Sequence, residues 1–124
     1  MIKVSALINL LKKNDSVFFT GVPDSVLKEL SSSLQSINKK NHIIASNEGA
    51  AVSIGIGHYL STKKIPTIYM QNSGLSNALN PLISIAHQKV YSIPLILIIG
   101  WRGSPRVKDE PQHNVKGKIT EQIL

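Results

Sequence analysis

The chain has 124 residues, of which 42% are hydrophobic, and it contains no cysteine. This length predicts at most one ordinary domain, covering residues 1–124, with enough apolar side chains for a core. The lack of cysteine excludes disulfides and thiolate metal sites and favours a reducing compartment. We find no signal peptide, and the longest apolar run, Ile93 to Gly100, is too short to span a bilayer. We therefore expect a cytoplasmic protein without a membrane partner.

A formal net charge of +7 raises the question of a nucleic-acid partner. Many of the lysines, however, occur as scattered pairs at the ends of predicted elements, where cations suit helix C-termini. Positive charge is concentrated only between Arg102 and Lys118, and this stretch lacks the stacking aromatic side chains that single-strand binders use. We therefore expect no nucleic acid and favour an anionic small molecule as the partner.

Helix-like and strand-like segments alternate along the chain. Helices are predicted over residues about 4–13, 26–37, 48–62 and 78–87, and apolar strands near residues 16–20, 42–45, 66–70 and 94–99. Pro81 would lie in the first turn of its helix, a long polar loop would run to about Gly117, and residues 119–124 would begin another helix. The alternation predicts an α/β fold, a parallel sheet with helices on both faces. Because the chain stops within a predicted helix, we expect a C-terminally truncated domain.

Glu48 lies between a short β-branched run and a helix that is rich in small residues. It is the only acidic residue between Glu29 and Asp109, and its small neighbours would let a large group approach the carboxylate. An ordinary explanation exists, because the helix dipole stabilises an acid in a first turn by about 0.3–1 kcal/mol. Asn47 or Ser46 would then be a simple N-cap. Taken alone, this motif favours the ordinary explanation.

Polar clusters follow the carboxyl ends of the predicted strands, which is where parallel α/β folds bind ligands. These clusters are Asp24-Ser25, Asn47-Glu48, Gln71 to Asn77, and the residues from Trp101 onward. Because the carboxyl ends of parallel strands meet at one edge of the sheet, four such clusters predict one site.

The order of these motifs is specific, although each motif alone is weak. They are Gly21-Val22-Pro23-Asp24-Ser25, Asn47-Glu48-Gly49, Met70 to Leu75, and Gly100-Trp101-Arg102-Gly103 followed by Lys108 to His113. Together they resemble the N-terminal, pyrimidine-binding domain of phosphonopyruvate decarboxylases, with the α-subunit of sulfopyruvate decarboxylases as the near relative. The resemblance covers nearly the whole chain.

The resemblance implies a thiamine diphosphate-dependent decarboxylase that converts phosphonopyruvate into phosphonoacetaldehyde and CO2, with sulfopyruvate as the alternative substrate. The cofactor supplies the carbanion and the electron sink, and the protein binds, orients and tunes it. Glu48 matches the catalytic glutamate that binds N1′ of the aminopyrimidine and favours its imino tautomer. Asp24 matches a position that faces the substrate, while a turn or N-cap role is an equal alternative.

Further residues take roles from the same resemblance. Gln71, Asn72, Ser73 and Gly74 match the segment that lines the cofactor pocket, although turn chemistry would also explain them. The substrate anion would be bound by Ser25, Arg102, Arg106, Lys108 and His113, and solvated loop charge is the alternative for each cation. His42, His58 and His87 are interpreted as structural.

The chain lacks the Gly-Asp-Gly motif that begins the family's magnesium and diphosphate site. The resemblance therefore implies that Mg²⁺ and the diphosphate bind a second domain or partner subunit, across the interface of a homo-oligomer. This chain alone would be inactive. The rival from another class is a non-catalytic, flavodoxin-like module that holds an anion or a partner at the same strand ends, and fold analogy cannot exclude it.

Overall fold

The computed structural model describes residues 2–105 and 107–124. Its strands are β1 (Phe19–Gly21), β2 (His42–Ile44), β3 (Thr67–Gln71) and β4 (Ile96–Gly100). They form a four-stranded sheet in the order β2-β1-β3-β4, and each neighbouring pair is parallel. The prediction of an α/β fold with a parallel sheet is confirmed.

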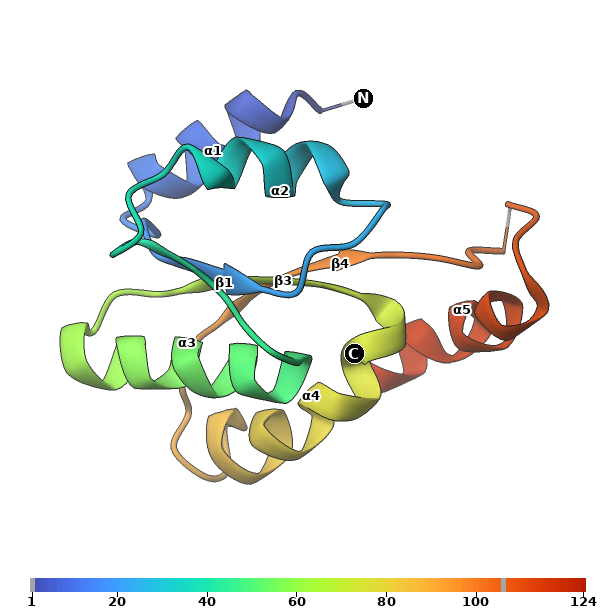
Figure 1. Ribbon diagram of the computed structural model, residues 1–124. Coiled ribbons are helices and arrows are strands. Elements are labelled where there is room, and N and C mark those ends of the chain that lie inside the picture. The colour runs from blue at the N-terminus through green and yellow to red at the C-terminus, as the bar shows by residue number, and fades with distance from the viewer. Residues whose placement is uncertain (1, 106) are drawn as a thin grey trace.

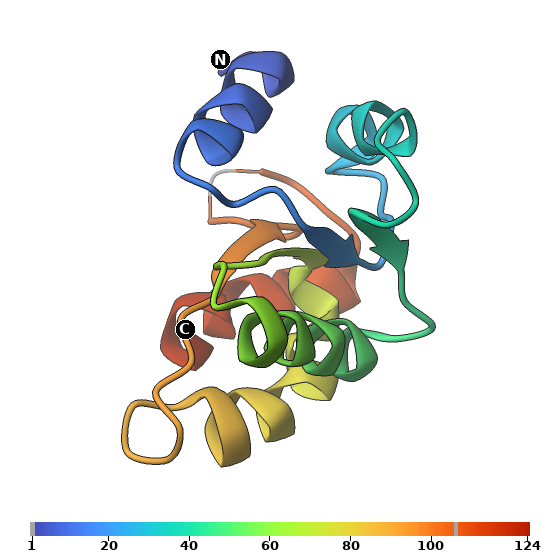
Figure 2. The same ribbon diagram turned by 90° about the vertical axis from the view of Figure 1, so that its left-hand side faces the viewer.

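Helices lie on both faces of this sheet (Figures 1 and 2). One face carries α1 (Val4–Lys13) and α2 (Lys28–Gln35), and the other carries α3 (Glu48–Thr62) and α4 (Leu75–Pro81). The last helix, α5 (Pro111–Ile123), lies at the carboxyl edge of the sheet, beside the turn that follows β3. In the described part of the chain no helix is long and apolar enough to cross a membrane.

Alternate side chains of the strands enter two separate cores. Phe19 and Tyr69 pack under α1 and α2, whereas Ile68 and Met70 pack against α3 and α4, and all four are fully buried. Burying a large apolar side chain contributes about 1.5–3 kcal/mol. The two cores cover both faces of the sheet, and the polar loops leave it at its carboxyl edge.

The strand boundaries differ from the prediction by at most three residues. β1 begins at Phe19 rather than near residue 16, although Ser16 and Phe18 are buried. Ser16 is held there by a side-chain bond of 2.8 Å between its Oγ and Oγ1 of Thr67, outside the backbone ladder. A buried approach to a strand has the same apolar pattern as the strand itself, so the pattern alone misplaced its start.

The prediction of a helix over residues 78–87 with Pro81 in its first turn was wrong. The chain turns directly after β3 into the 3₁₀ helix η1 (Asn72–Gly74), continues as α4, and Pro81 is the last residue of α4. Pro81 has no N–H to donate to the preceding turn. The regular α-helix therefore ends there, and the following η2 (Leu82–Ala86) is a π-helix.

The prediction of a polar loop as far as Gly117 was also wrong. α5 begins at Pro111, which occupies the favourable first position, and Gly117 lies inside the helix. A Cβ added at Gly117 would overlap the backbone carbonyl of Gly103, whose φ is +66°. Gly117 thus permits a close backbone approach rather than breaking the helix, and the predicted helix start at residue 119 is the final part of α5.

Candidate active site

A pocket of about 250 Å³ opens at the carboxyl edge of the sheet. Its lining comes from the segments that follow β1, β2 and β3, namely Val22, Pro23, Asp24, Ser25, Glu48, Gln71 and Ser73. A larger, mostly apolar hollow of about 440 Å³ lies between α1 and α2 and shares Ser25 with this pocket. We place the candidate site in the smaller pocket, because two carboxylates and several polar side chains converge there.

Glu48 is the first residue of α3. Asn47 is the N-cap, and its Oδ1 accepts a 2.9 Å hydrogen bond from the Ala50 N–H, so the helix start is satisfied without Glu48. Oε2 of Glu48 instead accepts a 2.9 Å bond from Nδ2 of Asn77 on α4. The carboxylate is therefore oriented by a second helix, which a simple dipole role does not require.

Two glycines bring the start of α3 and the start of α4 close together. A Cβ added at Gly74 would overlap Cγ, Cδ and Oε1 of Glu48. One added at Gly49 would lie 2.7 Å from the backbone oxygen of Asn77. The missing side chain at Gly74 thus creates the space in which the Glu48 carboxylate lies.

Asp24 has one bonded and one unbonded carboxylate oxygen. Oδ1 accepts hydrogen bonds from the backbone N–H groups of Val26 at 2.6 Å and Leu27 at 3.2 Å, which caps the turn into α2. Oδ2 is buried and has no hydrogen-bond partner among the described residues. A Cβ at Gly100 would lie 3.1 Å from both oxygens, so the glycine leaves room for the carboxylate. The geometry accommodates the turn role and leaves one oxygen for another partner.

The residues at the end of β3 and just after it have two different roles: some line the pocket, and one connects elements of the fold. Gln71 and Ser73 line the pocket and bind each other through Nε2 and Oγ at 2.7 Å. Asn72 is buried, and its Nδ2 donates 2.9 Å bonds to the Arg102 carbonyl and to Oγ1 of Thr120. Its Oδ1 accepts a 3.1 Å bond from the Arg102 N–H. The Asn72 amide therefore connects the ends of β3 and β4 with α5.

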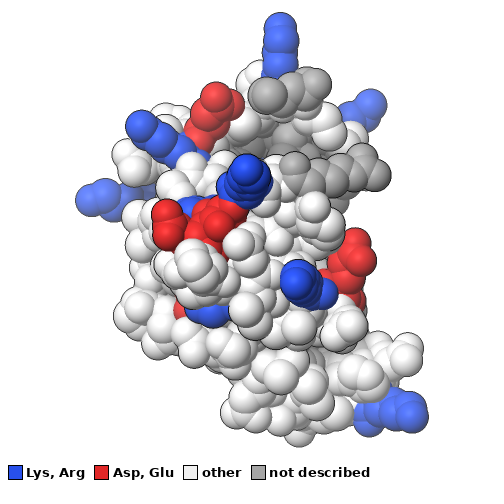
Figure 3. All heavy atoms as spheres, turned by 90° about the vertical axis from the view of Figure 1, so that its right-hand side faces the viewer, with Lys and Arg blue, Asp and Glu red and all other residues white. Residues whose placement is uncertain are grey.

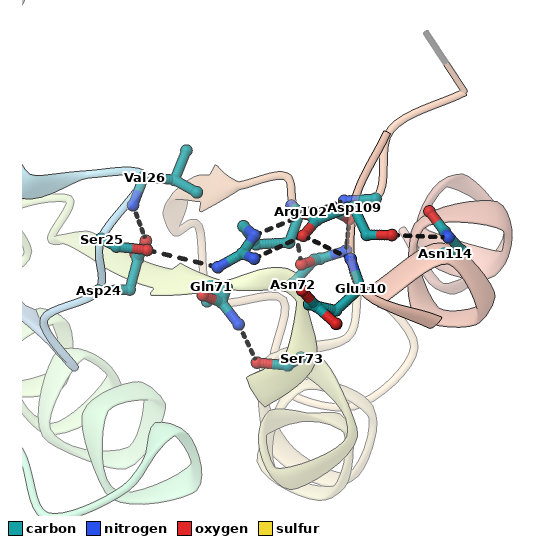
Figure 4. A network of polar contacts seen from close by, with 11 residues as sticks. Asp24, Ser25, Val26, Gln71, Asn72, Ser73, Arg102, Asp109, Glu110 and Asn114 are labelled. Atoms are coloured by element: carbon teal, nitrogen blue, oxygen red, sulfur yellow. Dashed lines mark hydrogen bonds and ion pairs between the residues drawn. The ribbon is translucent and has the colours of Figure 1, made fainter. Parts of the chain in front are cut away.

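Arg102 follows β4 and lies beside the pocket (Figure 4). Its Nε and Nη2 donate to Oδ2 and Oδ1 of Asp109 at 2.6 and 2.5 Å, and its Nη1 lies 3.5 Å from Oγ of Ser25. The hydrogen bonds between the two side chains raise the pKa of Arg102 and hold the pKa of the Asp109 carboxyl well below its usual range. Both groups are charged at neutral pH.

Two of the other predicted anion-binding residues, Lys108 and His113, lie apart from the pocket lining. Lys108 is exposed, and His113 is half-buried on α5, where its Nδ1 is buried without a partner among the described residues. Arg106 lies outside the described residues. Figure 3 looks onto this edge of the molecule and shows basic and acidic side chains side by side rather than a field of one sign.

The remaining predicted histidines contact structural partners. Nε2 of His42 and Oη of Tyr69 lie 2.9 Å apart, and the His58 ring stacks on Phe18 with 4.2 Å between centroids. Burial lowers the pKa of both histidines. Nδ1 of His87 accepts a bond of 3.1 Å from the Lys89 N–H. No group of three or more His, Cys, Asp or Glu side chains that could hold a metal occurs among the described residues.

Two residues of this site received no role from the sequence. Asn77 orients Glu48, and Asp109 binds Arg102, yet the first pair is separated by 29 positions and joins two different helices. Asn77 ends the predicted polar cluster Gln71 to Asn77, but nothing in that cluster pairs it with Glu48. An acid in a loop, such as Asp109, is a common residue. The only available signal for Asp109 was its place in the motif that ends at His113.

Two solved structures share this fold. A thiamin diphosphate-dependent enzyme from Mycobacterium smegmatis superimposes with a TM-score of 0.67 at 20% identity, over 87% of this chain and 20% of that one. The thiamine diphosphate-dependent 4-hydroxybenzoylformate decarboxylase of Rhodococcus jostii superimposes with a TM-score of 0.62 at 24% identity, over 82% of this chain and 19% of that one. At these identities the likeness establishes the fold alone.

The family is established by sequence. Residues 3–123 match the family described as thiamine pyrophosphate enzyme, N-terminal TPP binding domain, and the chain belongs to this family. It is 38% identical to the phosphonopyruvate decarboxylase of Streptomyces viridochromogenes, over 84% of this chain and 25% of the relative. It is 35% identical to the sulfopyruvate decarboxylase subunit alpha of Methanocaldococcus jannaschii, over 96% of this chain and 68% of the relative. The chain thus spans about a quarter of the Streptomyces relative.

Proposed function

We propose that this chain supplies the pyrimidine-binding half of the active site of a thiamine diphosphate-dependent decarboxylase. Its substrate is an anionic 2-oxo acid. Phosphonopyruvate, which would give phosphonoacetaldehyde and CO2, is the first candidate, and sulfopyruvate is the second. The observation that carries this proposal is the Glu48 carboxylate, which lies in a pocket at the strand edge and is oriented by Asn77 from another helix.

The described residues fit the pyrimidine end of the cofactor. Glu48 presents a carboxylate to the pocket, and the absence of a side chain at Gly74 leaves space for that carboxylate. Gln71 and Ser73 add an amide and a hydroxyl to the same lining. An aminopyrimidine has ring nitrogens and an exocyclic amine, so it requires such a mixture of acceptors and donors.

In this proposal Glu48 acts on a proton. Its carboxylate binds N1′ of the aminopyrimidine, and the bond from Asn77 keeps the side chain in place for that contact. The bound cofactor supplies a carbanion and an electron sink for the loss of CO2. The protein therefore contributes orientation and proton placement at N1′.

The substrate side of the pocket is formed by the segments after β1 and β4. Asp24 lines the pocket, with its Oδ2 buried in the pocket wall without a partner among the described residues. Ser25 and the outer edge of Arg102 offer donors to an anionic group. A phosphonate and a sulfonate are both tetrahedral anions, so these donors suit either substrate. We rank phosphonopyruvate first because two Streptomyces relatives of that name are 38% and 36% identical to this chain.

The rest of the active site belongs to another domain or subunit in this proposal. The diphosphate and Mg²⁺ would bind there, and the pocket at the strand edge would be completed across the interface of a homo-oligomer. The chain alone would then be inactive. The absence of cysteine suits a reducing compartment such as the cytoplasm.

The test is a decarboxylation assay with the assembled enzyme, meaning this chain together with the diphosphate-binding part. CO2 release should require thiamine diphosphate and Mg²⁺, should be fastest with phosphonopyruvate or sulfopyruvate, and should be much slower with pyruvate. Ranking the three substrates by kcat/KM decides between the two anions. An assembled enzyme that binds thiamine diphosphate but decarboxylates none of these acids would overturn the proposal.

A further inference from the structure

The Asp109 carboxylate accepts hydrogen bonds from one side of the Arg102 guanidinium. Its two oxygens receive Nε at 2.6 Å and Nη2 at 2.5 Å, the two-point geometry in which Arg and a carboxylate form their strongest bonds. The same oxygens accept the Gly103 N–H at 3.0 Å and the Glu110 N–H at 2.9 Å. The carboxylate therefore accepts four bonds, and its side chain is 11% exposed.

The backbone of Arg102 is fixed as well as its side chain. Asn72 binds both its N–H and its carbonyl, at 3.1 and 2.9 Å. Nδ2 of Asn114 binds the Asp109 carbonyl at 2.9 Å, which holds Asp109 on the first turns of α5. Asp109 therefore holds the guanidinium directly, while Asn72 and Asn114 hold the backbones of Arg102 and Asp109 (Figure 4).

One edge of the guanidinium remains for another partner. Asp109 occupies Nε and one side of Nη2, so Nη1 points toward Ser25, whose Oγ lies 3.5 Å away. Ser25 lines the candidate active site. At 3.5 Å this contact is weak for a hydrogen bond, and a tetrahedral anion would accept bonds from both groups.

We propose that Asp109 is a positioning residue that holds the guanidinium of Arg102 so that its outer edge, together with the Ser25 hydroxyl, receives the phosphonate or sulfonate group of the substrate. This inference rests on the proposed function for its substrate. The proposal explains why an acid lies beside an anion site. Asp109 weakens the net positive potential, but it fixes the planar guanidinium of Arg102 in one orientation. Preorganisation of this kind raises affinity because less side-chain freedom is lost on binding.

A purely structural role for the ion pair predicts something different. In that case Asp109 would only attach the loop to α5. The structure provides other attachments for α5, because Trp101 Nε1 donates to the Gly117 carbonyl at 3.0 Å and Asn72 binds Thr120 at 2.9 Å. Removing the Asp109 charge should therefore leave α5 docked and change substrate binding.

The experiment compares Asp109→Asn with Thr120→Val in the assembled enzyme. Thr120→Val removes an attachment of α5 without touching the guanidinium. We expect Asp109→Asn to raise KM for the anionic substrate about tenfold and to change kcat, and KM for pyruvate, by less than about threefold. Thr120→Val should lower the melting temperature and leave the ratio of the two KM values unchanged.

A second pair of measurements isolates the path through Arg102. In an Arg102→Gln background, Asp109→Asn should add nothing further to KM, because its effect acts through the guanidinium. Should Asp109→Asn not fold, Arg102→Gln carries the same expectation for the KM split. If Asp109→Asn raises KM for both substrates equally, as a loosened loop would, the positioning role is wrong.

Binding of methylphosphonate and methanesulfonate separates this inference from the proposed function. Calorimetry on the assembled enzyme needs no turnover, and Asp109→Asn should weaken the binding of either probe about tenfold while Thr120→Val should not. An inactive enzyme that shows this pattern contradicts the proposed reaction and supports the anion site. An active enzyme whose Asp109→Asn variant binds the probes like wild type overturns the inference.

Discussion

The Cα of Gly74 lies against the carboxylate of Glu48, so closely that a single added carbon would overlap Cγ, Cδ and Oε1 of that side chain. The two residues come from different strand ends, Gly74 from the turn after β3 and Glu48 from the start of α3. The position of the carboxylate therefore depends on a glycine that makes no polar contact with it. This relationship allows the proposed catalytic role of Glu48 to be tested separately from its contribution to the fold.

Gly74→Ala should reduce activity while the chain stays folded. The overlap is with the end of a flexible side chain, so Glu48 can rotate away and the fold can persist at a cost of about 1–3 kcal/mol. The displaced carboxylate would lose its bond to Asn77 and its place in the pocket. Decarboxylation by the assembled enzyme should fall at least tenfold, and chemical unfolding should show a stability loss within the range given above.

Gly57→Ala is the matched control. A Cβ there would meet no atom within 4 Å among the described residues, and the position lies on the exposed side of α3. Replacing a glycine in a helix interior by alanine should stabilise the chain by about 0.5–1 kcal/mol. Full activity in Gly74→Ala would show that the carboxylate does not need its observed position.

Gly117→Ala should undock α5. The added Cβ would overlap the Gly103 carbonyl, which is backbone and cannot rotate away, so we expect a loss of about 1–3 kcal/mol or more. The movement should break the bond from Trp101 to the Gly117 carbonyl, and Trp101 is the only tryptophan of the chain. A shift in its fluorescence should accompany the loss, whereas Lys118→Ala on the exposed side of α5 should alter neither. A Gly117→Ala variant with wild-type stability and fluorescence would contradict the packing described for α5.

The parallel sheet could be predicted because its strands and helices have different apolar periods. The predicted strand near residues 94–99 corresponds to β4, and the first predicted helix matches α1 in both bounds. The prediction failed where tertiary contacts override local signals. Gly117 reads as a loop residue, but it lies inside α5 because only a glycine permits contact with Gly103. Likewise, no pattern within residues 78–87 reveals that α4 begins at Leu75.

Only the location of the candidate site could be predicted from the sequence. The predicted strand ends indicated that Asp24, Glu48 and Ser73 would lie close together, because the carboxyl ends of parallel strands share one edge of the sheet. The partners of these residues could not be predicted, since Asn77 and Asp109 act through contacts between distant elements. Their roles depend on distances of about 3 Å, which sequence spacing does not encode.

Tyr69→Phe should change how stability falls in alkaline solution. Burial raises the pKa of Tyr69 from 10.0 to about 12 in the folded protein. The raised pKa contributes to the stability of the fold fully below pH 10. This stability is lost as the pH rises toward 12, because the unfolded chain releases the phenol proton at a lower pH than the folded protein does. The variant should be about 1 kcal/mol less stable at pH 8, where it lacks the bond to His42, and should lose less than wild type above pH 10. Parallel losses in urea titrations of the two proteins would contradict this assignment.

Asp24→Asn should separate substrate chemistry from cofactor activation. Asparagine can still cap the turn, because its side-chain oxygen can accept the Val26 and Leu27 N–H groups, so stability should change by less than about 1 kcal/mol. If Oδ2 of Asp24 serves the substrate, decarboxylation should slow while hydrogen exchange at C2 of bound thiamine diphosphate stays near the wild-type rate. Slowed C2 exchange in this variant would instead assign Asp24 to the cofactor.

The most direct test of the account is Glu48→Gln in the assembled enzyme, measured as hydrogen–deuterium exchange at C2 of bound thiamine diphosphate. The isosteric amide can keep the bond from Asn77, so the fold should persist, but it cannot supply the carboxylate at N1′. Glu29→Gln is the control, because Glu29 is also an acid in a first helical turn, on α2, and it lies outside the pocket. The account predicts that C2 exchange falls by orders of magnitude in Glu48→Gln and is unchanged in Glu29→Gln. Wild-type exchange in a Glu48→Gln enzyme that still binds the cofactor would contradict it.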